Sequence, residues 1–176
     1  MASPAKFQKY VKLALAGGAD VAKVIPARLV RTGEWVRLKC QFGCSGYNKR
    51  LCCPPYSPTP ETTRKMLAEY RWAVIFAYKG NEDRAARRKM QRFLAGLERI
   101  AFLDGYYKAF ALGAGPCRFC RVCDTTRRCR FPEYARPAME AAGIDVYATC
   151  RNAGIKLEVA TDRNQIPRYV SLLLLD

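Results

Sequence analysis

The chain has 176 residues, of which 50% are hydrophobic and 26% are charged, so it can form one packed domain over residues 1–176. It carries 31 Lys and Arg against 15 Asp and Glu, a net charge of +16, and nine cysteines, an odd number that cannot all form disulfides. The absence of histidine excludes His-ligated zinc, c-type haem attachment and activation of a nucleophile by imidazole.

Lys6, Lys9 and Lys12 interrupt the apolar residues near the N-terminus, so this segment lacks the unbroken apolar run of a secretory signal. No stretch of the sequence reaches the roughly 18 to 20 apolar residues that span a bilayer. We therefore expect a cytoplasmic protein that does not associate with membranes. In that compartment structural disulfides are rare, and clustered cysteines are more often metal ligands.

The first half of the sequence shows helix and strand patterns on either side of a cysteine-rich loop. Apolar residues at helical spacing precede Gly17, alternation indicates a strand near Trp35, and a continuous apolar run from Trp72 indicates a strand covered on both faces. The expected elements are a helix over 7–15, a strand over 34–39, a Cys- and Pro-rich loop over 40–60, a helix over 60–70 and a strand over 72–78.

The second half contains a long amphipathic helix and a second cysteine-rich loop. Its expected elements are a helix over 82–102, a strand over 106–112, the loop over 113–132, helices over 133–142 and 145–153, and strands over 156–160 and 168–175. This order predicts an α/β or α+β fold, with a mixed β-sheet of about five to six strands flanked by helices. Both cysteine loops are expected to leave the ends of strands.

The second loop contains Cys117, Cys120, Cys123 and Cys129, in the pattern C-x2-C-x2-C-x5-C. Two-residue gaps curl the backbone around one centre, and bacterial ferredoxins hold three corners of a [4Fe–4S] cluster with the same run. Zinc also accepts four cysteines in a tetrahedron, so structural zinc is the alternative. Arginines flank these cysteines and would stabilise the negative charge of either centre.

The first loop offers three thiols for a second metal centre, at Cys40, Cys44 and Cys53. Adjacent residues in an extended segment project to opposite sides, so Cys52 and Cys53 are not expected to bind the same centre. The fourth ligand is left open between Cys52, the remote Cys150 and no protein group at all. A cluster with only three protein ligands keeps an open iron that can bind a substrate, much as catalytic zinc keeps an open position.

The segments 40–44, 53–58, 115–129 and 136–146 resemble the family called "predicted metal-binding protein", domain of unknown function 2284. The resemblance covers the chain from about Val30 to its end. It implies metal binding through these cysteines, with an iron–sulfur protein as the usual expectation, and it implies no settled substrate.

The favoured function is that of a small protein with two [4Fe–4S] clusters, which exchanges electrons with an acidic redox partner attracted by the basic surface. An open iron at the first loop would add catalysis of sulfur or redox chemistry. The alternative is a zinc-stabilised nucleic-acid-binding module, favoured by the net charge and the basic segment 84–92, although no known nucleic-acid-binding motif is present. An enzyme with Cys150 as nucleophile ranks third, because no histidine can activate it.

Overall fold

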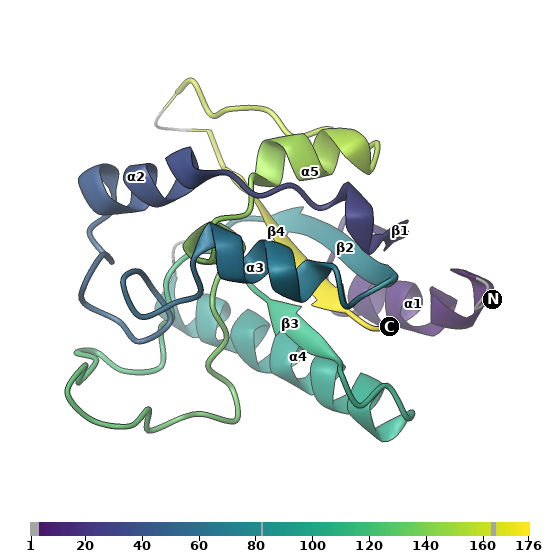
Figure 1. Cartoon of the computed structure of the whole chain (residues 1–176), viewed down its shortest axis with the longest axis horizontal. Coiled ribbons are helices and arrows are strands. Elements are labelled where there is room, and N and C mark those ends of the chain that lie inside the picture. Colours follow the sequence, from purple (N-terminus) through teal and green to yellow (C-terminus); the bar gives the residue numbers. More distant parts are fainter. Residues whose placement is uncertain (1–3, 82, 163–164) are drawn as a thin grey trace.

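A computed structural model describes residues 4–81, 83–162 and 165–176 (Figure 1). Its helices are α1 (Gln8–Ala16), α2 (Glu34–Gly43), α3 (Pro60–Leu67), α4 (Arg84–Leu103) and α5 (Val146–Asn152), with short 3-10 helices η1 (Pro4–Phe7), η2 (Ala27–Leu29) and η3 (Glu140–Ala142). Its strands are β1 (Val21–Pro26), β2 (Trp72–Lys79), β3 (Phe110–Leu112) and β4 (Arg168–Leu174).

The four strands form one antiparallel sheet in the order β1-β2-β4-β3. The central strands β2 and β4 are buried over most of their length, and successive residues point to opposite faces of the sheet. In β2, Ile75 belongs to the hydrophobic cluster on one face and Phe76 to the cluster on the other. The apolar run that begins at Trp72 is therefore a strand covered on both faces, as its sequence predicts.

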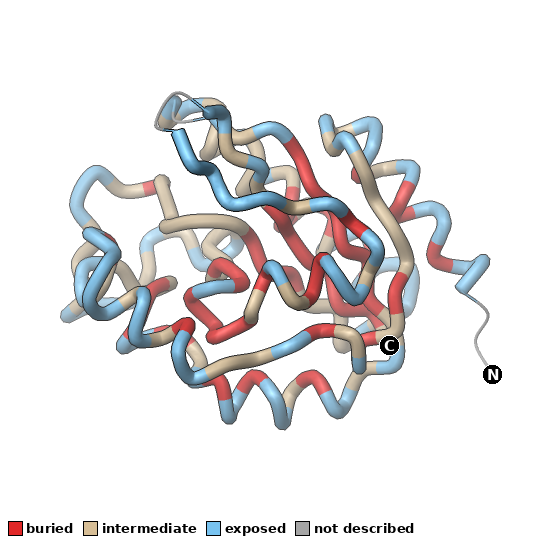
Figure 2. Tube along the Cα trace, turned by 90° about the horizontal axis from the view of Figure 1, so that it is seen from above, coloured by how far each residue is buried: buried red, intermediate tan, exposed pale blue. Residues whose placement is uncertain are grey.

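Helices cover both faces of this sheet. α1 and α4 pack on one face, where Tyr10 and Leu97 are buried. α3, α5 and the segment 138–144 pack on the other, where Leu67 and Val146 are buried. Figure 2 shows buried residues along the central strands and exposed residues along the outer turns of the helices. Within the described ranges, no helix is both long and apolar enough to cross a membrane.

The predicted mixed α/β fold is confirmed, with four strands rather than five or six. Most predicted elements have a counterpart in the structure, and Asp145 caps α5 by accepting the Ala148 N–H at 2.9 Å. Glu82, at which the prediction begins the long helix, lies outside the described residues. The correspondences are 7–15 with α1, 60–70 with α3, 72–78 with β2, 82–102 with α4, 106–112 with the shorter β3, 145–153 with α5 and 168–175 with β4.

The strand predicted over 34–39 is wrong, because these residues belong to helix α2. Six residues of alternating polarity span less than two helical turns, so tertiary contacts decide between the two structures. Arg37 of α2 donates hydrogen bonds to the Ser57 carbonyl and hydroxyl oxygens and to the Ala141 carbonyl, at 3.3, 3.0 and 3.2 Å. These bonds hold one side of α2 against the first loop and η3. The opposite side is open to solvent, where Leu38 is 54% exposed.

Three further differences from the sequence prediction concern backbone pairing. Strand β1, which the predicted elements do not include, pairs with β2. The helix predicted over 133–142 is reduced to the 3-10 turn η3, because backbone hydrogen bonds with Gly113 hold the residues before η3 in an isolated bridge. The strand predicted over 156–160 has no partner strand in the described part of the chain, and Leu157 and Val159 line a cavity instead.

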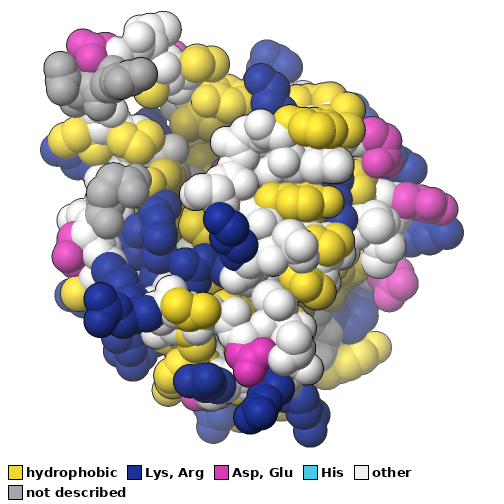
Figure 3. Space-filling view, turned by 90° about the vertical axis from the view of Figure 1, so that its left-hand side faces the viewer, with side chains coloured by type: hydrophobic (Ala, Val, Ile, Leu, Met, Phe, Trp, Pro, Cys, Tyr) yellow, Lys and Arg dark blue, Asp and Glu magenta, His cyan; other side chains and the backbone are white. Residues whose placement is uncertain are grey.

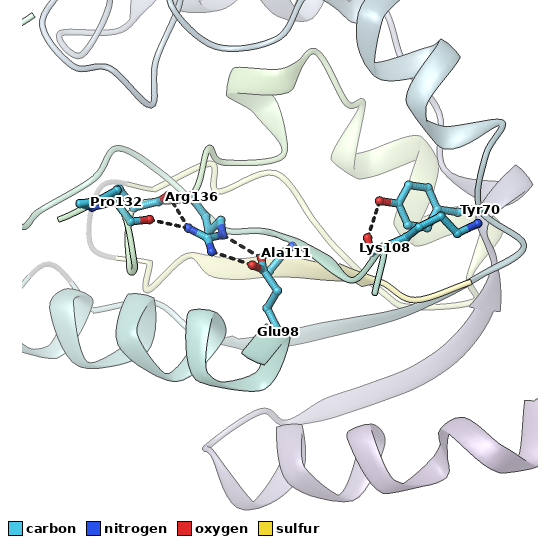
Figure 4. Close-up of polar contacts among 7 residues, drawn as sticks. Tyr70, Glu98, Lys108, Ala111, Pro132 and Arg136 are labelled. Carbon is cyan, nitrogen blue, oxygen red and sulfur yellow. Dashed lines mark hydrogen bonds and ion pairs between the residues drawn. The ribbon is translucent and has the colours of Figure 1, made fainter. Parts of the chain in front are cut away.

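One ion pair fastens the end of the second cysteine loop to the sheet (Figure 4). Arg136 forms a bidentate pair with Glu98 of α4, with N···O distances of 2.7 and 2.6 Å. Both side chains are largely buried, with 18% and 14% of their surface exposed. Glu98 also accepts the Ala111 N–H of the edge strand β3 at 2.7 Å, and Arg136 donates to the Pro132 carbonyl at 3.0 Å. Helix, edge strand and loop therefore meet at one carboxylate.

We expect Glu98→Gln to lower the free energy of unfolding by about 2–3 kcal/mol, because it leaves the Arg136 guanidinium largely buried without its charge partner. Urea denaturation measures this change. As a control, Glu158→Gln removes the partner of the exposed Lys156 and is expected to change stability by less than about 1 kcal/mol. Equal effects of the two substitutions would contradict a special role for the buried pair.

Candidate metal centres

The two cysteine loops lie side by side at one end of the molecule, on the left in Figure 1. The second loop leaves strand β3, as predicted, whereas the first leaves helix α2 rather than a strand. Arg50 of the first loop donates to the carbonyl of Cys120, 70 positions away in the sequence, at 3.4 Å. All nine cysteines are free thiols.

The second loop places its four predicted ligands, Cys117, Cys120, Cys123 and Cys129, around one small cavity of about 10 Å³. We call these four residues the second centre and this space the smaller cavity. A fifth cysteine, Cys52 of the first loop, lines the same cavity. The structure therefore brings the spaced cysteines of the second loop together. It adds Cys52, which the sequence made a candidate ligand of the first centre.

Cys52 and Cys117 are in direct contact. The Cys52 thiol donates a hydrogen bond to the Cys117 sulfur, and this bond lowers the pKa of Cys117 to about 6. The Phe119 backbone N–H and the nearby Arg50 and Arg84 guanidinium groups lower the pKa further, against the opposing effect of burial. The same hydrogen bond, followed by burial, raises the pKa of Cys52. These contacts favour the thiolate form of Cys117, the form of cysteine that binds metals.

Helix α4 holds the backbone of the second loop with polar side chains. Arg84 donates to the carbonyls of Arg118 and Phe119 at 3.0 and 3.1 Å. Gln91 donates to the Pro116 carbonyl at 3.2 Å and accepts the Arg118 N–H at 3.1 Å. Part of the basic face that the sequence predicts for this helix therefore positions the candidate ligands.

Phe119, which lies between two of these cysteines, anchors the second loop in the protein interior and is only 4% exposed. Its ring stacks on Tyr134 with 5.6 Å between centroids and lies 5.5 Å from the ring of Phe131. The guanidinium groups of Arg88 and Arg92 each lie 5.7 Å from the centroid of the Phe119 ring. One buried aromatic residue therefore fixes a loop that has no helix or strand of its own.

The first loop places Cys40, Cys44 and Cys53 at the wall of a larger cavity, and we call these three residues the first centre. Cys44 and Cys53 lie on either side of Gly46, where a Cβ would lie 3.5 and 3.6 Å from their sulfurs. The Gly46 N–H donates to the Cys44 sulfur at 3.4 Å. The Cys40 thiol donates to the Glu140 carbonyl at 3.9 Å. The backbone at Gly46 is therefore a near neighbour of two sulfurs of the first centre.

Burial raises the pKa of Cys40, and it raises the pKa of Cys53 to about 12. The neighbouring Cys44 adds to both shifts, whereas Arg37 lowers the pKa of Cys40 and Arg50 lowers that of Cys53. In the metal-free protein these two thiols are therefore protonated at neutral pH. Binding of a metal by the first centre must displace their protons, which makes metal affinity pH-dependent.

The larger cavity measures about 630 Å³, within the size range of small-molecule sites. Its wall is mainly apolar and includes the aromatic side chains of Trp35, Tyr47, Tyr147 and Tyr169. The carboxylate residue Glu140, which follows the cysteine loops in sequence, also lines it. The first centre therefore faces a space that can take an organic molecule.

Two candidates for a fourth ligand of the first centre lie elsewhere. Cys52 lines the smaller cavity and Cys53 the larger one, although these two residues lie in a turn and not in the extended segment that the prediction assumed. Cys150 is fully buried in the hydrophobic core on α5, where burial raises its pKa to about 11, and it lines neither cavity. From the described residues, the larger cavity thus receives three thiols.

The two cavities share a dividing wall made of two short segments. Cys52 faces the smaller cavity and Cys53 the larger one, and in the second loop Pro116 faces the larger cavity and Cys117 the smaller. The preceding Gly115 has φ +63°, a left-handed backbone conformation that favours glycine at this turn. Two pairs of consecutive residues therefore separate the two centres.

Positive charge surrounds the second loop. Figure 3 views the end of the molecule where both loops lie, and Lys and Arg side chains are more prominent there than Asp and Glu. Within residues 117–130, one acidic residue, Asp124, accompanies the arginines Arg118, Arg121, Arg127, Arg128 and Arg130. This excess of cations suits a centre built from negatively charged thiolates.

In the part of the chain that the structure describes, no group of three or more Cys, Asp or Glu side chains is placed to hold one metal ion. The cysteines that line the two cavities are candidate ligands by their sequence spacing and by their position.

We expect Phe119→Ala to lower the free energy of unfolding by about 3 kcal/mol and to speed amide hydrogen exchange across 117–136, because it removes the buried anchor of the second loop. Val122, in the same loop, is 82% exposed, so Val122→Ala is the matched control and is expected to change neither measurement. Similar exchange rates in the two variants would mean that the ring does not order the loop.

The comparisons with known proteins bear on this site. The family model described as "Predicted metal-binding protein (DUF2284)" matches residues 23–175, a span that includes both cysteine loops. No curated protein and no solved structure matches the chain. The chain belongs to the predicted metal-binding protein family, domain of unknown function 2284.

Proposed function

We propose that the protein binds two iron–sulfur clusters, one beside each cavity, and uses them in redox chemistry. The family is one of predicted metal-binding proteins, and the candidate ligands are all free thiols. Cysteine thiolates are the usual ligands of iron–sulfur clusters. The observation that carries the proposal is the position of Cys117, Cys120, Cys123 and Cys129 around one cavity.

The sequence spacing C-x2-C-x2-C-x5-C favours a cluster over zinc, because bacterial ferredoxins hold three corners of a [4Fe–4S] cluster with the same C-x2-C-x2-C run. Zinc bound by four cysteines is the alternative, and the iron, sulfide and zinc content of the protein distinguishes the two.

The first centre supports a more specific proposal, a cluster with one iron left open toward the larger cavity. Three thiols line that cavity, and neither Cys52 nor Cys150 adds a fourth. When bound, such a cluster would supply an electron-transfer group with one position open to a ligand. The mainly apolar and aromatic wall can bind the organic part of a substrate. We propose on this basis that the first centre catalyses sulfur or redox chemistry.

We further propose that the protein exchanges electrons with an acidic partner protein. The thin wall between the two cavities would bring two clusters close together, and the basic surface around the second loop would attract an acidic redox partner. The alternative of a nucleic-acid-binding module rests on the basic segment 84–92. Arg84 and Arg92 of that segment contact the second loop, so this part of the helix is less available to phosphate groups.

We expect protein purified without oxygen to contain iron and acid-labile sulfide and to show broad visible absorption. Cys117→Ser is expected to lower the iron content by about half, because it removes a ligand of one of two clusters. The matched control is Cys150→Ala, which removes a core thiol and is expected to leave the metal content unchanged. Stoichiometric zinc without sulfide in the wild-type protein would refute the proposal.

We also expect a small exogenous thiol to change the electron paramagnetic resonance spectrum of the first centre and not that of the second, because only the first has an open position. The assignment uses Cys44→Ser, which is expected to abolish the thiol-sensitive signal, and Cys117→Ser, which is expected to retain it. A thiol effect that survives Cys44→Ser and disappears in Cys117→Ser would place the open iron at the other centre.

A further inference from the structure

Arg50 of the first loop lies between the two candidate centres and is hydrogen-bonded to a cysteine of each. Its backbone carbonyl accepts the N–H of Cys53, which belongs to the first centre, at 2.9 Å. Its guanidinium group donates to the carbonyl of Cys120, which belongs to the second centre, at 3.4 Å. The same side chain lines the smaller cavity. One residue of the first loop therefore reaches both centres through its own hydrogen bonds.

No acidic side chain balances the charge of Arg50. In the described part of the chain, no ion pair includes this residue, and its guanidinium group donates to a neutral carbonyl. The residue is partly buried, where an unpaired charge is costly. Of the described residues that line the smaller cavity, only the cysteines can carry negative charge. The charge of Arg50 is therefore directed at the second centre.

We propose that Arg50 supplies a fixed positive charge to a cluster bound at the second centre and thereby raises the reduction potential of that cluster. The inference rests on the proposed iron–sulfur function. A guanidinium group stays protonated at physiological pH, so its charge does not depend on the state of the thiols around it. The reduced form of a cluster carries one more negative charge than the oxidised form. A neighbouring cation therefore stabilises the reduced form more strongly.

The charge and the backbone of Arg50 can be tested separately. The hydrogen bond from the Cys53 N–H ends on a backbone carbonyl, so a substitution of the side chain does not remove its acceptor. The side chain lines the smaller cavity, whereas the described lining of the larger cavity does not include Arg50. Removal of the charge is therefore expected to affect the second cluster more than the first.

The test compares Arg50→Gln with Arg127→Gln and with the wild-type protein, all purified without oxygen. Each substitution removes one positive charge, but the Arg127 side chain is 84% exposed and lies outside the lining of the smaller cavity. In a redox titration followed by electron paramagnetic resonance, Arg50→Gln is expected to shift the second cluster to a lower potential, with a smaller shift of the first. Arg127→Gln is expected to leave both potentials close to those of the wild type, because solvent and salt screen an exposed charge.

A second variant distinguishes charge from packing. Arg50→Lys keeps the charge and is expected to restore most of the wild-type potential. All three variants are expected to keep the full content of iron and acid-labile sulfide, because none of them changes a cysteine. The signals of the two clusters are assigned with Cys44→Ser and Cys117→Ser, as above.

The outcomes that would overturn the inference are distinct from failure of the proposed function. Full iron content with an unchanged potential in Arg50→Gln would show that Arg50 does not set the potential. Equal shifts in Arg50→Gln and Arg127→Gln would show that only the net charge of the protein matters. Equal shifts in Arg50→Gln and Arg50→Lys would assign the effect to packing. Absence of iron and sulfide from the wild-type protein would instead refute the proposed function.

Discussion

The attachment of the second cysteine loop to helix α4 is the constraint on which the candidate site depends. Ordering a backbone residue costs about 1–2 kcal/mol, and this loop has no helix or strand to offset that cost. It is compensated by contacts with α4: the buried ring of Phe119, the hydrogen bonds of Arg84 and Gln91, and the ion pair between Arg136 and Glu98. Helix α4 therefore stabilises the second loop as well as the hydrophobic core.

Helix α4 also reduces the electrostatic repulsion between cysteine thiolates that lie close together. Several thiolates in one cavity repel one another, and burial alone disfavours the charged form of each. Arginines from α4 and from both loops supply the compensating charge, of which Arg50 and Arg84 act on Cys117 directly. The high arginine content of this chain thus has a structural use close to its cysteines, besides any effect at long range.

Much of the fold could be predicted from the sequence, and the failures have physical causes. Long periodic segments were identified correctly, because burial on both faces of β2 and on one side of α4 leaves a clear pattern. Helix α2 was mistaken for a strand, since its only buried residue is Val36 and long-range bonds to Arg37 hold it in place.

Spacing predicted which cysteines of the second loop come together. It could not show the contact between Cys52 and Cys117, which depends on how the two loops pack.

The dividing wall has a consequence for how the protein matures. Since a single peptide unit joins Cys52 to Cys53, and another joins Pro116 to Cys117, filling one cavity restrains the backbone that borders the other. Binding of a metal centre in one cavity would then order part of the backbone around the other cavity and so lower the entropic cost of binding there. By thermodynamic reciprocity this effect on affinity would be the same in either order.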